Sequence, residues 1–182
     1  MNQNLVFSSK AVVYLSLLLI FSSCNCNRHL KNQLTAFEKE TIALPQRVLK
    51  VENGKSGIST IQPEGKTLVI FFAPKECTSC ALSHLKQSES VLEMFDSSPA
   101  ASVVVLFVPD DEDFEETVQL VSKESFSIPV YVDFERCFLD NKIPEDIRFH
   151  SFLLDEDGHP VVVGNPISSE RIRDLMLNQI DG

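Results

Sequence analysis

The chain has 182 residues and a formal net charge of −10 at pH 7, with 26 Asp and Glu against 16 Lys and Arg. This acidic balance argues against nucleic acid as a partner and against electrostatic attachment to an anionic lipid surface. The length is sufficient for one domain with a proper hydrophobic core.

The N-terminal segment has the pattern of a secretory signal. Lys10 precedes an apolar run over residues 11–21, which is too short to span a bilayer comfortably and ends in small residues. The ending Ser22-Ser23-Cys24 resembles the lipobox of bacterial lipoproteins, in which cleavage leaves the cysteine modified with lipid. We therefore expect residues 1–23 to be removed as a lipoprotein signal peptide and Cys24 to be the lipidation site, which implies a lipid-anchored, periplasm-facing protein of the bacterial cell envelope.

Residues 24–46 are expected to form a tether. They are polar, with scattered apolar residues, and a short helix there would be ended by Pro45. Cys26 lies beside the anchor site and is interpreted as incidental. The domain itself is expected over residues 47–182.

Alternating elements follow the tether. Residues 48–51 could form a first strand, and a Gly-rich loop is expected at residues 54–57. Residues 67–72 are a continuous run of apolar, β-branched and aromatic residues, which indicates a strand buried on both faces. Apolar residues then recur at helical spacing and predict a helix that begins near two cysteines: Leu82, Leu85, Leu92 and Phe95.

The second half of the chain continues this alternation. Residues 102–108 predict a second buried strand, and residues 129–133 a short third one. Between them, Phe114, Val118 and Val121 indicate a helix. Residues 151–155 and 160–163 flank an Asp-Gly pair, which is a strong hairpin signal. Ile172, Leu175 and Met176 indicate a closing helix that is capped by Ser168 or Ser169.

Strand–helix alternation followed by a hairpin and a terminal helix predicts an α/β sandwich with a mixed sheet. The stretch LVIFFAPKECTSC resembles the strand, turn and helix of thioredoxin-like proteins. The stretch SFLLDEDGHPVVVGNP resembles the hairpin of their exported TlpA and ResA branch. The likeness covers roughly residues 46–182 and implies a thioredoxin-like three-layer sandwich with a mixed central sheet.

Cys77 and Cys80 are the candidate catalytic residues. At a helix N-terminus, unpaired backbone N–H groups carry partial positive charge and stabilise a thiolate. The resemblance implies that Cys77 attacks and that Cys80, one turn into the helix and more buried, resolves the mixed disulfide. An inert structural disulfide and a metal site remain alternatives, because the same spacing suits zinc or copper.

The sequence departs from the family pattern around this dithiol. Thioredoxin-like enzymes place a cis-proline opposite the dithiol, whereas the alignment puts Phe149 or His150 there, so Phe149, His150 and Ser151 are expected to line the substrate-facing loop. Ile70 occupies the place of the buried acid that many members keep. One extra residue separates Ala73 from Cys77.

His150 raises a second resemblance. The stretch HSFLLDEDG is similar to a segment of Sco-type copper chaperones, in which that histidine joins two cysteines around copper. Thiolates and imidazole suit copper, which makes Cys77, Cys80 and His150 the alternative metal ligands. Those proteins space their cysteines by three residues, however, and this chain has two, so we expect no metal here. His84, one turn beyond Cys80, is interpreted as solvated.

Three further features are interpreted without a catalytic role. Peroxiredoxins share the fold but need Thr or Ser three residues before the reactive cysteine, where this chain has Cys77. Cys137 is expected to be buried beside Phe134 and Phe138. The acidic run over residues 109–116 is interpreted as a solvated helix start, because acidic residues are favourable there.

The sequence thus predicts a thiol–disulfide oxidoreductase of the cell envelope. Its partners would be the thiols and disulfides of exported proteins and a redox partner protein, and the membrane would be contacted through the lipid. No cofactor is expected, because the dithiol itself carries two electrons. The alternative is a non-enzymatic lipoprotein that keeps the fold as an interaction or Sco-like copper-binding module.

Overall fold

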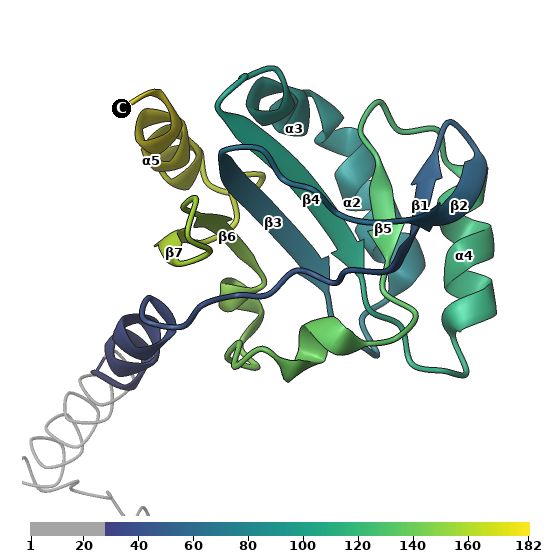
Figure 1. Cartoon of the computed structure of the whole chain (residues 1–182), viewed down its shortest axis with the longest axis horizontal. Helices are drawn as coiled ribbons and strands as arrows, with labels where there is room; N and C mark the ends of the chain where they lie inside the picture. The colour runs from purple at the N-terminus through teal and green to yellow at the C-terminus, as the bar shows by residue number, and fades with distance from the viewer. Residues whose placement is uncertain (1–27) are drawn as a thin grey trace, which may run out of the picture. The chain divides into compact units, whose positions relative to one another are not determined.

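A computed structural model of the chain describes residues 28–182 (Figure 1). The expected signal peptide, the lipidation site Cys24 and Cys26 lie outside the described residues. The chain divides into two units, and the described part of the first, residues 28–36, is helical. The second unit, Phe37–Gly182, holds the sheet and all the candidate site residues that the structure describes. Within residues 28–182, every helix falls short of the length and apolar character that crossing a bilayer requires.

A seven-stranded mixed sheet organises the second unit. Strands β3, β4 and β5 are parallel, and each other strand is antiparallel to its neighbours. The strand order across the sheet is β2 (Lys55–Ser59), β1 (Val48–Glu52), β5 (Val130–Val132), β4 (Ala101–Phe107), β3 (Lys66–Phe72), β6 (Ser151–Leu154) and β7 (Pro160–Val163).

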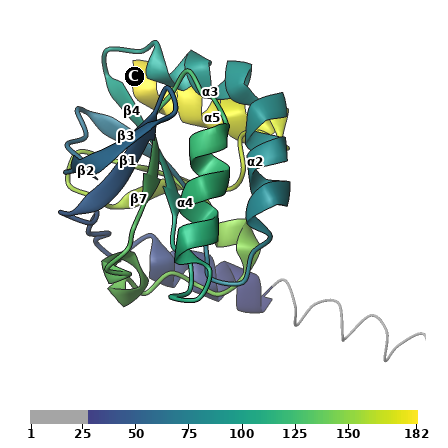
Figure 2. The same ribbon diagram turned by 90° about the vertical axis from the view of Figure 1, so that its right-hand side faces the viewer.

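Four helices cover one face of this sheet (Figure 2). They are α2 (Thr78–Gln87), α3 (Glu89–Asp96), α4 (Phe114–Lys123) and α5 (Glu170–Asp181). The crossovers from β3 to β4 and from β4 to β5 run in the same direction, and right-handed crossovers in one direction place their helices on one face. The main core lies between sheet and helices, where Leu82, Leu85, Leu92 and Phe95 are all buried as expected.

The opposite face is covered by short segments rich in aromatic residues. Two 3-10 helices, η1 (Cys137–Asp140) and η2 (Ile147–Phe149), lie between β5 and β6 in the sequence. Phe37 packs edge-on against Phe149 and Phe152, with ring centroids 5.8 and 5.2 Å apart. Phe37 and Ile42 are both buried, so residues at the start of the second unit, within the expected tether, contribute to its packing.

The expected α/β fold with a mixed sheet is confirmed, and two predictions of secondary structure are wrong. Residues 54–57 do not form a loop, because Lys55–Ser59 is strand β2, paired with β1. Asn53 and Gly54 have φ values of 52° and 70°, and two such residues make the hairpin turn that suits strand twist. The single helix expected after the cysteines is instead α2 and α3, which are separated at Ser88, a residue type that favours helix ends.

Cys137 was expected to be buried, and the structure shows that it is exposed. The neighbouring Phe138 fills the interior instead, with 0% exposure and its ring 5.1 Å from that of Phe71. Successive residues of a short helix point in different directions, so Phe138 is buried while its neighbour Cys137 is exposed. The acidic run over residues 109–116 forms ion pairs with Arg136. The Arg136 guanidinium lies 3.1 Å from Asp110 and 3.9 Å from Asp111.

Gly65, just before β3, supplies the first testable prediction. Its φ is +66°, and an added Cβ would overlap the backbone carbonyl of Ala100. Gly65→Ala should therefore lower the free energy of unfolding by about 2 kcal/mol or more. Urea unfolding measures this change. Gly57→Ala is the matched control, because its Cβ would enter open space, and it should stay within about 0.5 kcal/mol of wild type. Equal stabilities for the two variants would contradict the prediction.

Candidate functional site

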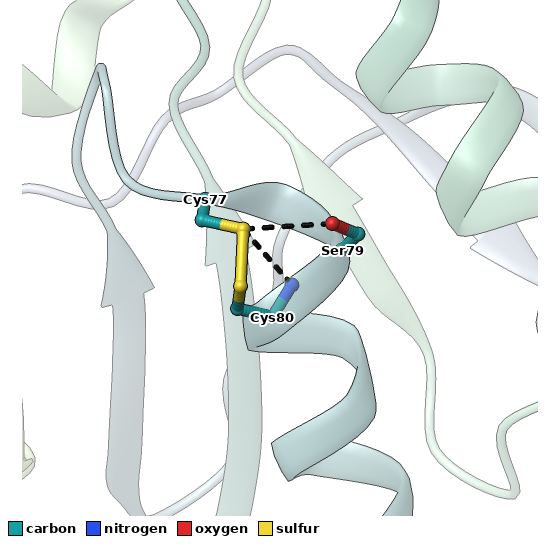
Figure 3. Close-up of a disulfide and its surroundings, with 3 residues drawn as sticks. All are labelled: Cys77, Ser79 and Cys80. Atoms are coloured by element: carbon teal, nitrogen blue, oxygen red, sulfur yellow. Dashed lines mark hydrogen bonds between the residues drawn. A yellow bond between two sulfur atoms is a disulfide. The ribbon is translucent and has the colours of Figure 1, made fainter.

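Cys77 and Cys80 form a disulfide at the N-terminus of α2 (Figure 3). Their Cα atoms are 5.3 Å apart. Cys77 is the N-cap residue of the helix, and its Sγ accepts a hydrogen bond from the Cys80 backbone N–H at 3.3 Å. The Ser79 hydroxyl lies 3.5 Å from the same sulfur. The side chain of Cys77 thus takes the place that Ser, Asp or Asn occupies at other helix starts.

The turn between β3 and α2 is closed by Glu76. Its backbone N–H donates to the Ala73 carbonyl at 3.2 Å, and its Oε1 accepts from the Ala73 N–H at 2.8 Å. Lys75, inside the turn, has a left-handed φ of 69°. These contacts fix the direction in which the chain leaves β3, so that the Cys80 N–H in the first turn of α2 points to the Cys77 sulfur.

The first turn of α2 contains no acidic residue, so nothing within it opposes the partial positive charge of the helix terminus. The start of α2 is also held against α4, because the Thr78 hydroxyl lies 3.4 Å from the hydroxyl of the buried Thr117. A thiolate on Cys77 would therefore accept the Cys80 N–H at the positively polarised end of the helix.

An apolar cavity of about 510 Å³ lies beside the disulfide. Its lining comes from β3, α2, η2, the start of β6 and the loop after β7, and includes Phe72, Leu85, Ile147 and Ile167. Both cysteines are exposed, although Cys80 was expected to be the more buried of the two. The reason is that both line this open cavity, and one turn of helix does not carry Cys80 beneath the surface.

His150 lies on this cavity together with the two cysteines, as does Ser151. The His150 residue is only 8% exposed and its ring packs on Phe71, with ring centroids 4.3 Å apart. Its Nδ1 lies 2.9 Å from Oε1 of Glu76. Phe149, the third residue of the expected substrate-facing loop, is 2% exposed and packs against Phe37 instead of lining the cavity. The burial of Phe149 does not support the expectation that this residue lines a substrate-facing loop.

Glu76 was missed as a site residue in the sequence. The signal for it was present, since it is the residue immediately before Cys77 in a turn that is one residue longer than the family pattern. All peptide bonds of residues 28–182 are trans, including those around His150. Many thioredoxin-like proteins keep a buried acid at the position that Ile70 occupies in this chain. Ile70 is 3% exposed and lines the same cavity.

His84 also lines the cavity from α2 and is exposed. In the part of the chain that the structure describes, no group of three or more His, Cys, Asp or Glu side chains is arranged to hold a metal ion. The three residues named as alternative metal ligands therefore share a cavity without forming such a group.

Cys137 is the free cysteine in the described part of the chain. Desolvation raises the pKa of its thiol, and the carboxylates of Asp133, Glu135 and Asp140 raise it further. A thiol with a raised pKa holds less thiolate at neutral pH and is a weaker nucleophile.

No protein-family model and no curated protein matches the sequence. Solved structures that resemble it include a thioredoxin-like protein from Porphyromonas gingivalis (16% identity over 79% of this chain and 92% of that chain, TM-score 0.48). StoA from Bacillus subtilis has 17% identity over 72% of this chain and 98% of its own (TM-score 0.46). The bacterioferritin comigratory protein of Xanthomonas campestris has 16% identity over 79% and 97%, with a TM-score of 0.49.

At these identities and TM-scores the likeness carries no argument about what this chain does. The assignment rests on the chain's own strand order and on the Cys77–Cys80 disulfide at the start of the helix that follows β3. These features agree with the predicted α/β sandwich with a mixed central sheet and place a cysteine pair at disulfide distance.

Asp146, which caps η2, provides a pH-dependent prediction. Hydrogen bonds from the Arg148 side chain and backbone lower the pKa of Asp146 from 3.8 to about 2. A lowered folded-state pKa stabilises the fold above the unfolded pKa, and this contribution is lost as the pH falls through the folded value. Asp146→Asn should therefore be less stable than wild type above about pH 4, and the difference should vanish as the pH falls to about 2.

Urea unfolding of both proteins across this pH range measures the difference. Asp111→Asn is the matched control, since the Asp111 side chain is 90% exposed. It should show no comparable loss of stability. A stability difference between Asp146→Asn and wild type that stays constant from pH 5 to pH 2 would contradict the prediction.

Proposed function

We propose that this chain is a thiol–disulfide oxidoreductase of the bacterial cell envelope that acts on exported proteins. The observation that carries the proposal is the exposed Cys77–Cys80 disulfide at the N-terminus of α2. Exposed disulfides tend to be the ones that exchange, and this one joins residues three apart and lies at an open cavity.

The local geometry supports a division of roles between the two sulfurs. Cys77 is the nucleophile, because its Sγ already accepts an N–H bond from the helix terminus and that terminus stabilises its thiolate. Cys80 is the resolving thiol, because it lies within disulfide reach of Cys77 and can attack a mixed disulfide formed there.

The cavity supports a polypeptide as the substrate. Its walls are mainly apolar, and Ile147 at its rim is 67% exposed. Apolar side chains that flank a substrate cysteine would be removed from water there while the sulfur atoms meet. The substrates would be the disulfides or thiols of exported proteins, and a second redox protein would return Cys77 and Cys80 to their starting state.

The cellular location in this proposal rests on the sequence. Removal of residues 1–23 and lipid attachment at Cys24 would hold the domain at the periplasmic side of a membrane. Because the chain is acidic, the lipid and not the protein surface would provide the attachment.

The reduction potential of the dithiol tests the proposal. In the full chain carrying Cys24→Ser, Cys26→Ser and Cys137→Ser, Cys77 and Cys80 are the two thiols that remain. Equilibration in glutathione or dithiothreitol buffers should give a potential between about −120 and −270 mV, the range of exchanging dithiols. A value below about −300 mV would identify a structural disulfide and favour the interaction-module alternative.

Two variants of the same protein test the assigned roles. In an assay of insulin disulfide reduction, Cys77→Ser should abolish turnover because the nucleophile is lost. Cys80→Ser should abolish turnover as well but should accumulate a covalent mixed disulfide with the substrate, which a non-reducing gel detects. Trapping by the Cys77→Ser variant instead would reverse the assignment.

A further inference from the structure

Thiol–disulfide exchange moves a proton as well as electrons, and the cavity beside the dithiol holds a residue that can accept this proton. The inference rests on the function proposed above. Before Cys80 can resolve a mixed disulfide, its thiol must lose a proton, because the thiolate is the attacking species. Ile70 occupies the expected position of an acid and cannot accept that proton. The titratable groups on the cavity other than the two thiols are Glu76, His84 and His150.

His150 is held in place from three sides. Its ring packs on Phe71, its carbonyl accepts the Phe71 N–H at 2.9 Å, and its Nδ1 lies 2.9 Å from Glu76 Oε1. That carboxylate oxygen also accepts the Ala73 N–H, so Glu76 is fixed by the turn that leads into Cys77. A histidine whose Nδ1–H donates to a carboxylate keeps Nε2 as the basic nitrogen.

We propose that His150 is the proton-transfer residue for Cys80 and that Glu76 positions it. Glu76 holds the Nδ1–H tautomer and stabilises the imidazolium that forms when Nε2 accepts a proton. The arrangement joins two segments 74 residues apart in the sequence, one directly before the dithiol and one directly after η2.

In the direction of substrate reduction, the Cys77 thiolate first attacks the substrate disulfide. A Cys77–substrate disulfide forms, and the first substrate thiolate leaves. His150 Nε2 then takes the proton from the Cys80 thiol, and the Cys80 thiolate attacks Cys77 Sγ. The Cys77–Cys80 bond forms, the mixed disulfide breaks, and the second substrate thiolate leaves and receives the proton from His150. Two electrons pass from the dithiol to the substrate, and substrate oxidation is the reverse.

The charged surroundings favour His150 over His84 for this role. His84 on α2 is exposed, whereas His150 is almost fully buried against Phe71 and faces a carboxylate. Asp146, the N-cap of η2, and Arg148 within η2 precede His150 and pair with each other through several hydrogen bonds. Among the described residues, Glu76, His84 and the two cysteines share the cavity with the imidazole, and Asp146 interacts with it electrostatically.

The experiment follows the two exchange steps separately. The reduced full chain, with Cys24, Cys26 and Cys137 changed to Ser, is mixed with dithiobisnitrobenzoate, which releases one coloured thiolate when Cys77 attacks and a second when Cys80 resolves. His150→Asn keeps an amide N–H for Glu76 but has no basic nitrogen. It should slow the second release by about 100-fold, within the range for general acid–base groups, and leave the first release nearly unchanged.

The pH profile separates proton transfer from a structural role. If His150 transfers the proton, the rate of the second release should change with pH in wild type, and this pH dependence should be missing in His150→Asn. Glu76→Gln should slow the second release less than His150→Asn does. Free imidazole should restore part of the rate in His150→Ala, which supplies a second variant if the asparagine substitution disturbs the fold.

His159→Asn is the matched control, because His159 is also partly buried with Nδ1 bonded to an acceptor, the Glu40 carbonyl, but lies outside the cavity. It should behave as wild type. If His150→Asn releases the second thiolate as fast as wild type does at every pH, the assignment of His150 is overturned. If wild type itself fails to release the second thiolate, or has a potential below about −300 mV, the proposed function fails instead.

Discussion

Burial of β3 on both faces is the constraint on which the rest of the structure depends. Leu68 and Ile70 point into the core beneath the helices, whereas Val69 and Phe71 point to the aromatic layer on the other face, and none is more than 4% exposed. A strand of this kind must lie inside the sheet, with β4 on one side and β6 on the other. The carboxyl end of β3 therefore lies in the middle of the sheet edge at which the parallel strands end.

The site follows from this placement. The chain leaves β3 at Phe72 and must turn at once to cover the sheet with α2, so the first turn of that helix lies at the sheet edge. Strand β6 begins beside the same end, with Ser151 paired to Ile70, and this brings His150 next to the turn. One carboxylate, that of Glu76, then bonds to both segments. The dithiol and the histidine are thus positioned by backbone that the core holds rigid.

The two faces of the sheet serve this site differently. The helical face supplies α2, whose apolar side buries Ala81, Leu82 and Leu85 and leaves its N-terminus open. The other face is covered by short segments. There Phe37 packs against Phe149, the last residue of η2, and against Phe152 in β6, and these contacts hold the end of η2 against the sheet. Phe149 thereby acts as an anchor for His150, its neighbour in the chain, and not as a wall of the cavity. The cavity beside the sulfur atoms stays open, with the exposed Ile147 in its lining.

The sequence by itself determined the elements that depend on local pattern. The apolar runs of β3 and β4, the helical spacing of Leu82 and Leu85, and the Asp-Gly hairpin were each predictable, because period and turn chemistry act over a few residues. The place of Cys77 and Cys80 at a helix start followed from the same reasoning, since the strand ends where the helical pattern begins.

Only the tertiary structure decided which residues surround the dithiol. The contact between Glu76 and His150 joins residues far apart in the chain, and no local pattern marks it. The exposure of Cys80 and of Cys137, and the burial of Phe149, depended on which neighbours the fold brings near each residue. Burial is a property of packing between segments, and a sequence pattern specifies only which face of a segment is apolar.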